Sequence, residues 1–206
     1  MEELIVIYDK EKRDRGRDSY IRAIKKQIPG VRVADVANLP EVGRSKLLIL
    51  KPMNDGDYET LKTFLKYNPG RDIEGIGSGK LTITAEAIIR VIGPVDKKTV
   101  VIINQSDVLG RPLAKELIER GANVISLNSS YPCIDNLLTM TDIDVLVSAS
   151  GQGEFELDRE LTRMIDVKID LSNDLEDPIK ITSVPTIEVL KDRLENSNKL
   201  WEQSND

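Results

Sequence analysis

The chain contains no histidine, and only one of its 206 residues is a cysteine. The missing imidazoles exclude serine–histidine–aspartate triads, histidine-ligated zinc or haem, and the usual general base that titrates near neutral pH. Proton transfer would therefore have to use lysine, aspartate, glutamate, tyrosine or Cys133. A single cysteine cannot form an internal disulfide, so nothing in the composition favours secretion.

Long hydrophobic runs and an excess of positive charge are also missing. The longest apolar runs, such as 47–50 and 100–103, are far shorter than the ~18 residues that a membrane span needs. The apolar run at 4–8 leads straight into charged residues, so we expect no leader segment. With a net charge of −6, the chain lacks the basic domain typical of nucleic-acid binding. We expect a cytoplasmic protein that binds neither nucleic acid nor membranes.

Short apolar runs alternate with amphipathic stretches along the chain. Runs with strand character occupy 4–8, 31–36, 46–50, 99–103, 123–127, 144–150 and 167–172. Helical spacing occupies 19–28, 57–67, 82–92, 112–120, 133–140 and 186–197. Asp57 is the expected N-cap of the second of these helices. The alternation predicts an α/β fold with parallel sheets. Glycine and proline cluster near 69–79 and at 93–94, which indicates a boundary between two lobes at 80–93.

The segment 99–120 is typical of a strand, a turn and a helix, and its turn carries the clearest chemical signal. Dinucleotide-binding folds place glycines at such a turn so that the backbone can approach a pyrophosphate at a helix N-terminus. Here Gly110 is the glycine in position, and Pro112 suits a first helical turn. Ser106 can donate to phosphate, and Asn104 tolerates a positive φ. The residues alone indicate a nucleotide site only weakly, and a plain strand-to-helix turn is the alternative.

Seven segments resemble, in order, motifs of the bifunctional methylenetetrahydrofolate dehydrogenase/cyclohydrolases (FolD). NQSDVLGRP at 104–112 is similar to that family's G-R-S-x-x-V-G-x-P loop. The other six segments are LKPMN (50–54), RDIEG (71–75), NVISLNSS (123–130), DVLVSASG (144–151), KIDLS (168–172) and ITSVP with Thr186. Together they cover most of the chain.

The resemblance implies a two-lobed α/β protein. A catalytic-type α/β lobe would occupy 1–85, a Rossmann-like, parallel-sheet NAD(P)-binding lobe 86–182, and a C-terminal helix at 183–206 would pack back on the first lobe. Family members oxidise 5,10-methylenetetrahydrofolate by hydride transfer to NAD(P)⁺ and then hydrolyse the methenyl product to 10-formyltetrahydrofolate. The expected cofactor is NAD or NADP, the expected substrate is a folate or related pterin, and the expected assembly is a homodimer.

Carrying the family's motifs over residue by residue implies two groups of site residues. The cofactor group consists of Asn104, Gln105, Ser106, Val108, Gly110, Pro112, Asn128, Ser129 and Gly151. The catalytic group consists of Lys26, Tyr20 and Glu74, and no metal site is expected. In the family, a tyrosine stacks on the pterin and a lysine acts near the reacting carbon. Glu74 would hold the amino-pyrimidine edge of the pterin.

The helix that would supply the tyrosine and lysine reads S-x-x-Y-x-x-x-K in the family, and two registers compete here. Aligning Ser19 puts Lys26 at the lysine position and Arg22 at the tyrosine position. Aligning Tyr20 instead puts Ile24 at the lysine position. We expect Lys26 to be the functional lysine, with Tyr20 nearby, and a solvated helix face is the alternative for these basic residues.

Three departures from the family's motifs shape the expected activity. Leu50 replaces the glutamine that would bond the lysine, so cyclohydrolase activity is less expected than dehydrogenase activity. Gln105 and the uncharged 128–130 segment supply no cation for the 2′-phosphate of NADP. No acidic residue ends the strand at 123–127 to bind the ribose of NAD, so only a slight preference for NAD is expected.

The sequence therefore predicts an NAD(P)-dependent methylenetetrahydrofolate dehydrogenase and leaves residual cyclohydrolase activity open. A non-catalytic relative that binds a nucleotide or pterin is the first alternative, and a dehydrogenase for another imine or pterin is the second. Outside the site, we expect Cys133 to be a modestly buried structural thiol and Asp166 and Asp170 to serve caps and turns. Trp201 is expected to pack the last helix, with a subunit contact as the alternative.

Overall fold

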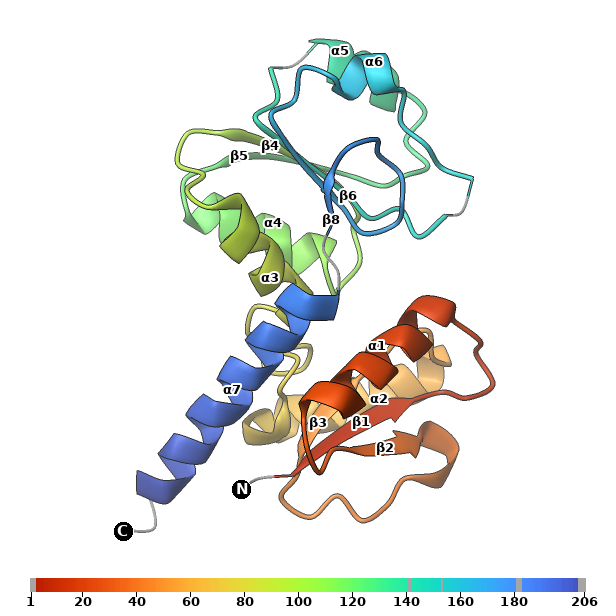
Figure 1. Cartoon of the computed structure of the whole chain (residues 1–206), viewed down its shortest axis with the longest axis vertical. Helices are drawn as coiled ribbons and strands as arrows, with labels where there is room; N and C mark the ends of the chain where they lie inside the picture. Colours follow the sequence, from red (N-terminus) through yellow and green to blue (C-terminus); the bar gives the residue numbers. More distant parts are fainter. Residues whose placement is uncertain (1–2, 141, 153, 181–182, 204–206) are drawn as a thin grey trace. The chain divides into compact units, whose positions relative to one another are not determined.

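The computed structural model describes residues 3–140, 142–152, 154–180 and 183–203. The chain divides into two compact units, which are Met1–Ile83 with Ser183–Asp206, and Thr84–Thr182. Each unit contains a parallel sheet and its own helices (Figure 1). The α/β class with parallel sheets is thereby confirmed. Among the described helices, none is both long and apolar enough to cross a membrane.

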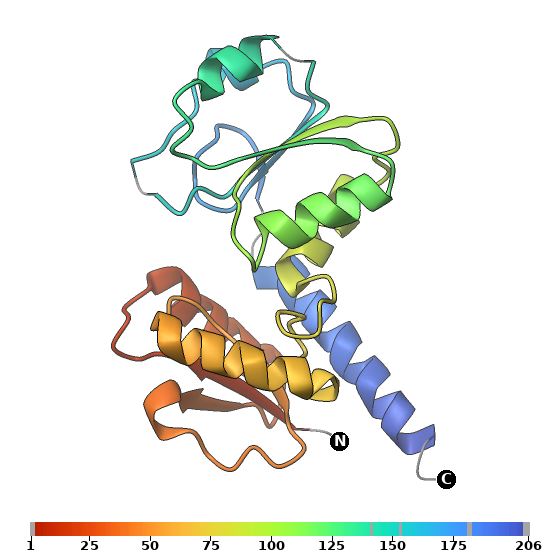
Figure 2. The same cartoon turned by 180° about the vertical axis from the view of Figure 1, so that it is seen from behind.

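Unit 1 is built on a three-stranded parallel sheet in the order β2-β1-β3. The strands are β1 (Leu4–Tyr8), β2 (Arg32–Asp35) and β3 (Lys46–Ile49). The central strand and β3 are buried almost throughout, as expected for continuous apolar runs. Helices α1 (Arg15–Gln27) and α2 (Asp55–Tyr67) lie on opposite faces of this sheet (Figures 1 and 2). The long helix α7 (Ser183–Gln203) packs beside α1.

Side-chain caps determine where the first two long helices begin. The Asp14 carboxylate accepts a hydrogen bond from the Arg17 backbone N–H at 2.6 Å, so α1 begins at Arg15, before the predicted start at residue 19. The Asn54 side chain caps α2 by accepting from Gly56 N–H at 3.0 Å. The prediction that Asp57 is the cap was wrong, because Asp57 lies in the first turn of α2. There its charge still favours the helix dipole.

Unit 2 contains a five-stranded, all-parallel sheet in the order β5-β4-β6-β7-β8. Its strands are β4 (Thr99–Ile103), β5 (Asn123–Leu127), β6 (Val145–Ser148), β7 (Val167–Asp170) and β8 (Ile179–Lys180). Helices α3 (Ile83–Ile92) and α4 (Gly110–Glu119) cover one face of the sheet, and α5 (Ile134–Met140) and α6 (Arg159–Thr162) lie toward the other (Figure 1). The chain passes from β4 to β5 on one side and then returns to β6 on the other. The sheet order thus reverses beside β4, and such reversals are where doubly wound folds bind ligands.

Most strand boundaries follow the apolar pattern to within two residues, whereas the shortest elements do not. The four-residue helix α6 and the two-residue strand β8 were not predicted, because neither is long enough to show a period. The 3₁₀ turns η1 (Val36–Asn38) and η2 (Pro69–Arg71) were not predicted for the same reason. Helix α7 extends beyond the predicted 186–197 at both ends.

Candidate functional site

A buried carboxyl group in unit 1 is the most unusual feature of that unit. Glu74 lies in the segment between η2 and α3 and is only 8% exposed. Its Oε1 accepts a hydrogen bond from the backbone N–H of Ile83, at 3.3 Å. Burial raises the pKa of Glu74 to about 8, although the nearby positive charge of Arg193 opposes the rise. At neutral pH the free site therefore holds a mostly protonated carboxyl group that a modest change of surroundings can ionise.

Tyr20 shares this site with Glu74. The tyrosine lies on α1 and is partly buried, and burial raises its pKa above the ordinary value, with a further contribution from the charge of Glu74. A hydrogen bond with the side chain of Thr186, on α7, works in the opposite direction. Two of the three predicted catalytic residues, Tyr20 and Glu74, are thus electrostatic neighbours although they are 54 positions apart in the sequence.

Arg193 of α7 fixes the segment that carries Glu74. Its guanidinium donates to the backbone carbonyls of Ile73 at 2.8 Å, Glu74 at 3.1 Å and Leu81 at 2.5 Å. A guanidinium is well suited to this role because its donors form a rigid fork. Sequence reasoning missed Arg193, since nothing in the pattern of an amphipathic helix indicates which loop its polar face will meet.

The RDIEG segment is shaped by its first carboxylate. Asp72 is buried and accepts hydrogen bonds from the backbone N–H groups of Gly75, Gly77 and Ser78, each between 2.7 and 2.8 Å. Gly75 has φ +100°, and a Cβ there would lie 2.7 Å from the carbonyl oxygen of Lys80. The segment is therefore a tightly folded support for Glu74.

The third predicted catalytic residue, Lys26, lies elsewhere. It is exposed in the last turn of α1, six residues from Tyr20, and so projects from a different side of the helix. Ile24, one turn after Tyr20, is fully buried. Lys25 is exposed as well. Leu50, at the family's glutamine position, is buried at the end of β3 and supplies no polar side chain.

In unit 2, the predicted nucleotide turn is organised around the side chain of Asn104. Its Oδ1 accepts from Ser106 N–H at 2.9 Å, from Ser106 Oγ at 2.7 Å and from Gly110 N–H at 3.0 Å. Its Nδ2 donates to the carbonyl of Ala149 at 2.7 Å. Ala149 directly follows β6, so Asn104 joins the carboxyl ends of β4 and β6 at the reversal point of the sheet.

Gly110 allows the start of α4 to lie directly against the end of β4. A Cβ on Gly110 would lie 1.8 Å from the carbonyl oxygen of Asn104, far inside any real contact distance. No other residue type can occupy this position without moving the backbone. The turn therefore has the close strand-to-helix packing that dinucleotide sites require.

Two buried aspartates hold the segment that follows β6. Asp174 is 2% exposed, and its carboxylate accepts from Ser148 Oγ at 2.6 Å, Ser150 Oγ at 2.8 Å and Ser150 N–H at 3.0 Å. Asp170 accepts from the backbone N–H groups of Ser172, Asp174 and Leu175. Asp170 therefore serves a turn, as expected. Asp174 was missed, because only the folded sheet brings it to Ser148 and Ser150.

The remaining predicted cofactor residues lie around the same edge of the sheet. Gln105 is exposed and donates to the Ser126 carbonyl at 2.9 Å, and Asn128 accepts from Ser130 within its own turn. Gly151 has φ +67° and donates to Ser172 Oγ at 3.1 Å. The other three residues are partly buried, and they are Val108, Pro112 and Ser129.

Three further residues were considered in the sequence analysis, and they are Cys133, Asp166 and Trp201. Cys133 is exposed, just before α5, so the prediction of a modestly buried thiol was wrong. Asp166 is exposed, and no group of three or more metal-ligating side chains occurs among the described residues. The side chain of Trp201 lies outside the described residues.

Comparison with known proteins gives the family of unit 2. Residues 82–179 match the model of the tetrahydrofolate dehydrogenase/cyclohydrolase NAD(P)-binding domain. This segment, which makes up most of unit 2, is therefore similar to that NAD(P)-binding domain. The bifunctional protein FolD of Dictyoglomus thermophilum is 28% identical over 163 residues, which are 72% of this chain and 56% of that protein. FolD of Lactobacillus helveticus is 30% identical over 102 residues, 42% of this chain and 36% of that protein. The chain therefore spans about half the length, or less, of these curated relatives.

Solved structures show the same fold at low sequence identity. The NAD-dependent 5,10-methylenetetrahydrofolate dehydrogenase of Saccharomyces cerevisiae is similar with a TM-score of 0.74 and 16% identity, over 100% of this chain and 89% of that one. The Trypanosoma brucei FolD, solved with NADP and an inhibitor, has a TM-score of 0.69 and 18% identity, over 98% and 86%. At this identity the likeness concerns the fold.

Replacing Gly110 with alanine tests the packing of the turn. The new methyl group would overlap a backbone carbonyl that cannot rotate away, so we expect Gly110→Ala to lower the free energy of unfolding by about 3 kcal/mol or more. Urea denaturation measures this change. Gly70→Ala is the control, because a Cβ there meets nothing within 4 Å. Equal stability of the two variants would show that the helix start does not press on β4.

Replacing Glu74 with glutamine tests the buried carboxyl group. Between its ordinary pKa of 4.5 and about 8, the folded chain keeps a proton that the unfolded chain releases. Glu74 therefore contributes less to stability as the pH rises through this window, and above pH 8 its charge is buried at a cost. We expect Glu74→Gln to be more stable than the parent by about 2–4 kcal/mol at pH 9, with a smaller gain at pH 6.

Thermal and urea unfolding at the two pH values measure the effect of Glu74. Glu156→Gln serves as the control, because Glu156 is exposed and its substitution should change stability little at either pH. A Glu74→Gln protein that is no more stable than the parent at pH 9 would mean that the carboxyl group is not held away from water.

Proposed function

We propose that the protein is an NAD(P)-dependent dehydrogenase that oxidises 5,10-methylenetetrahydrofolate or a closely related pterin. One observation carries the proposal: the buried Glu74 carboxyl and Tyr20 lie together in a chain whose other unit is an NAD(P)-binding domain. Perturbed carboxyl groups of this kind concentrate at functional sites. The chain shares its fold with the NAD-dependent 5,10-methylenetetrahydrofolate dehydrogenase of Saccharomyces cerevisiae.

The turn after β4 fits a dinucleotide. The absence of a side chain at Gly110 lets the start of α4 pack directly against the end of β4, and Asn104 holds the turn to the end of β6. Both features lie where the strand order reverses, which is where doubly wound sheets bind nucleotides. Ser106 and Gly151 would lie beside the cofactor, whose nicotinamide accepts the hydride when bound. The turn's own task is to hold the dinucleotide in one orientation.

The pair in unit 1 fits the pterin. Tyr20 offers an aromatic face to a flat ring, and the ionised Glu74 would accept two hydrogen bonds from the ring N–H and amino group of an amino-pyrimidine. Such a ligand favours the charged form of Glu74 and so lowers its pKa from about 8. Arg193 would keep the carboxyl in place, because it fixes the backbone on both sides of it.

We propose that dehydrogenase activity outweighs cyclohydrolase activity. The register anchored on Tyr20 puts buried Ile24 at the lysine position, and Leu50 offers no polar partner there. In the alternative register the catalytic lysine would be Lys26, whose side chain is exposed. Hydrolysis needs a group that moves a proton, whereas hydride transfer depends chiefly on the relative position of two bound molecules.

We also propose a modest preference for NAD over NADP. Residues 128–130, which follow β5, carry no charge, and the side chain of Gln105 is already bonded to the Ser126 carbonyl. A 2′-phosphate held near the end of β5 would find no cation in this segment.

A non-catalytic pterin- or nucleotide-binding protein is the second candidate function. The observation that favours it is the buried Ile24 where the family has its lysine. Such a protein would gain thermal stability from either ligand without turning over.

Mixing the protein with methylenetetrahydrofolate and NAD⁺ or NADP⁺ tests the proposal, with reduced nicotinamide followed by absorbance. We expect turnover that is faster with NAD⁺ and falls by roughly tenfold to a hundredfold in Tyr20→Leu and Glu74→Gln, because the pterin loses its position. Lys26→Ala should keep most of the activity. Loss of turnover in Lys26→Ala would instead support the register that places this lysine in the site. Ligand-induced stabilisation without turnover would support the non-catalytic alternative.

A further inference from the structure

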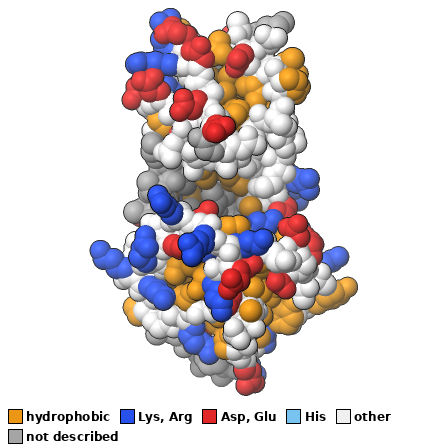
Figure 3. Space-filling model, turned by 90° about the vertical axis from the view of Figure 1, so that its right-hand side faces the viewer, with side chains coloured by type: hydrophobic (Ala, Val, Ile, Leu, Met, Phe, Trp, Pro, Cys, Tyr) orange, Lys and Arg blue, Asp and Glu red, His pale blue; other side chains and the backbone are white. Residues whose placement is uncertain are grey.

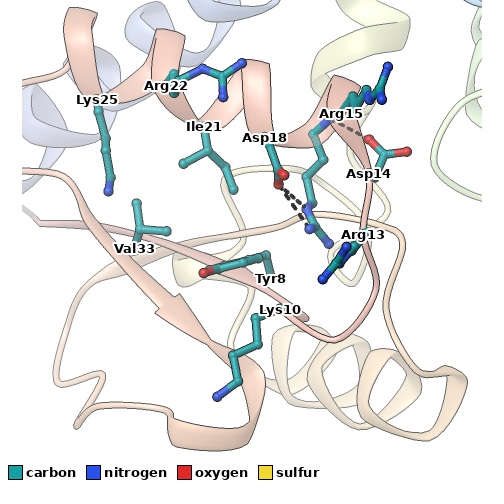
Figure 4. Close-up of a pocket in the computed structure, with 11 residues that line it drawn as sticks. Tyr8, Lys10, Arg13, Asp14, Arg15, Asp18, Ile21, Arg22, Lys25 and Val33 are labelled. Carbon is teal, nitrogen blue, oxygen red and sulfur yellow. Dashed lines mark hydrogen bonds and ion pairs between the residues drawn. The ribbon is translucent and has the colours of Figure 1, made fainter.

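A pocket in unit 1 is lined by none of the three predicted catalytic residues, Tyr20, Lys26 and Glu74. It has a volume of about 800 Å³ and lies at the carboxyl end of β1, between α1 and β2. Figure 4 shows its residues, with Tyr8 in the middle, Ile21 on α1 and Val33 on β2. These three side chains give the pocket an aromatic and aliphatic lining.

Positive charge surrounds this lining. Six cationic side chains line the pocket, and they are Lys10, Arg13, Arg15, Arg17, Arg22 and Lys25. The only carboxylates in the lining are those of Asp14 and Asp18. Figure 3 shows several basic side chains gathered on this side of unit 1, with apolar side chains between them. Such a concentration is unexpected in a chain whose net charge is −6.

Most of these positive charges are not neutralised by the protein. Lys10 pairs with Asp35 at 2.9 Å, and Arg17 pairs with Asp18 at 3.1 Å. Asp14 is engaged as the N-cap of α1. Among the described residues, the four remaining cations have no ion pair or side-chain hydrogen bond, and they are Arg13, Arg15, Arg22 and Lys25. Like charges held close together repel unless an anion lies between them.

One cation is built into the wall of the pocket. The side chain of Arg17 is only 4% exposed, donates to the carbonyls of Asp9 at 2.8 Å and Pro52 at 3.3 Å, and lies 5.0 Å from the centre of the Tyr8 ring. Its guanidinium fixes the loop after β1 and keeps the aromatic ring in place. The pocket therefore has a partly apolar floor, held by the buried Arg17, and an exposed cationic rim.

This pocket is distinct from the Tyr20 site, because α1 turns different faces to the two. Arg22 and Lys25 are three residues apart, so they share one face with Asp18 and Ile21. Tyr20 is directed toward Thr186 on α7. A ligand in this pocket would not need the pterin site.

We propose that the pocket binds a small molecule with at least two acidic groups on a flat or apolar body. Tyr8, Ile21 and Val33 would contact the body, while Arg22, Lys25 and Arg13 would bind carboxylate or phosphate groups. Guanidinium groups bind both kinds of anion in a bidentate manner. This site goes beyond the proposed dehydrogenase function and does not depend on it.

Fluorescence anisotropy of 1,3,6,8-pyrenetetrasulfonate, a flat polyanion, tests the proposal on the full chain at low ionic strength. We expect one equivalent to bind, and we expect Arg22→Gln/Lys25→Gln to weaken binding about tenfold or more. The matched control is Lys26→Gln/Lys66→Gln, which removes two exposed charges outside the pocket and should weaken binding less than about twofold. Both double variants change only exposed side chains, and their thermal unfolding confirms that they are folded.

Competitors then distinguish the acidic group and the place of binding. Displacement by tripolyphosphate favours phosphate ligands, and displacement by citrate favours polycarboxylates; either result supports the site. Equal loss of affinity in the two double variants would overturn the proposal, because the probe would then respond to another site or to overall charge alone.

Discussion

The withdrawal of one carboxyl group from water is the constraint around which unit 1 is arranged. Keeping Glu74 buried requires that its neighbours supply what water would have supplied. The Ile83 N–H donates to it, Arg193 places a positive charge nearby, and Asp72 folds the supporting segment through three backbone N–H groups. Since Arg193 lies on α7, the last helix of the chain completes a site that begins on the first helix.

This arrangement costs stability, and the cost is informative. A buried carboxyl with a raised pKa destabilises the folded chain above its ordinary titration range. Perturbed carboxyl groups concentrate at functional sites, and this tendency supports the pterin-binding role that we propose for Glu74. In unit 2, Asp174 is also buried, but its carboxylate accepts three hydrogen bonds from Ser148 and Ser150. Under the proposed function, Glu74 differs from Asp174 because a bound ligand would supply it with further partners.

The two units place their candidate ligand contacts at the same kind of position in the fold. In both, a buried strand ends in a polar turn that leads into a helix, and the candidate ligand contacts lie at that end. In unit 2, the turn is shaped by backbone packing of Gly110 against Asn104. In unit 1, the acidic ligand that we propose would contact side chains of the pocket.

The sequence predicted the architecture well and the sites in part. Buried strands such as 99–103 can be predicted because they are continuous apolar runs, and such runs are typical of the inner strands of a parallel sheet. Helix starts were less accurate, because Asp14 and Asn54 compete as caps with other polar residues nearby. Arg193 and Asp174 could not be found, since each bonds to groups that only the folded chain brings within reach.

The most direct test of the account is the number of protons released when tetrahydrofolate binds. Calorimetric titration at pH 7 in buffers of different ionisation enthalpy measures it. If the pterin is held by the ionised Glu74, the parent protein should release about one proton per ligand, because its carboxyl is mostly protonated when free. Glu74→Gln should bind more weakly and release none. Tight binding without proton release in the parent would contradict the central claim that this buried carboxyl receives the substrate.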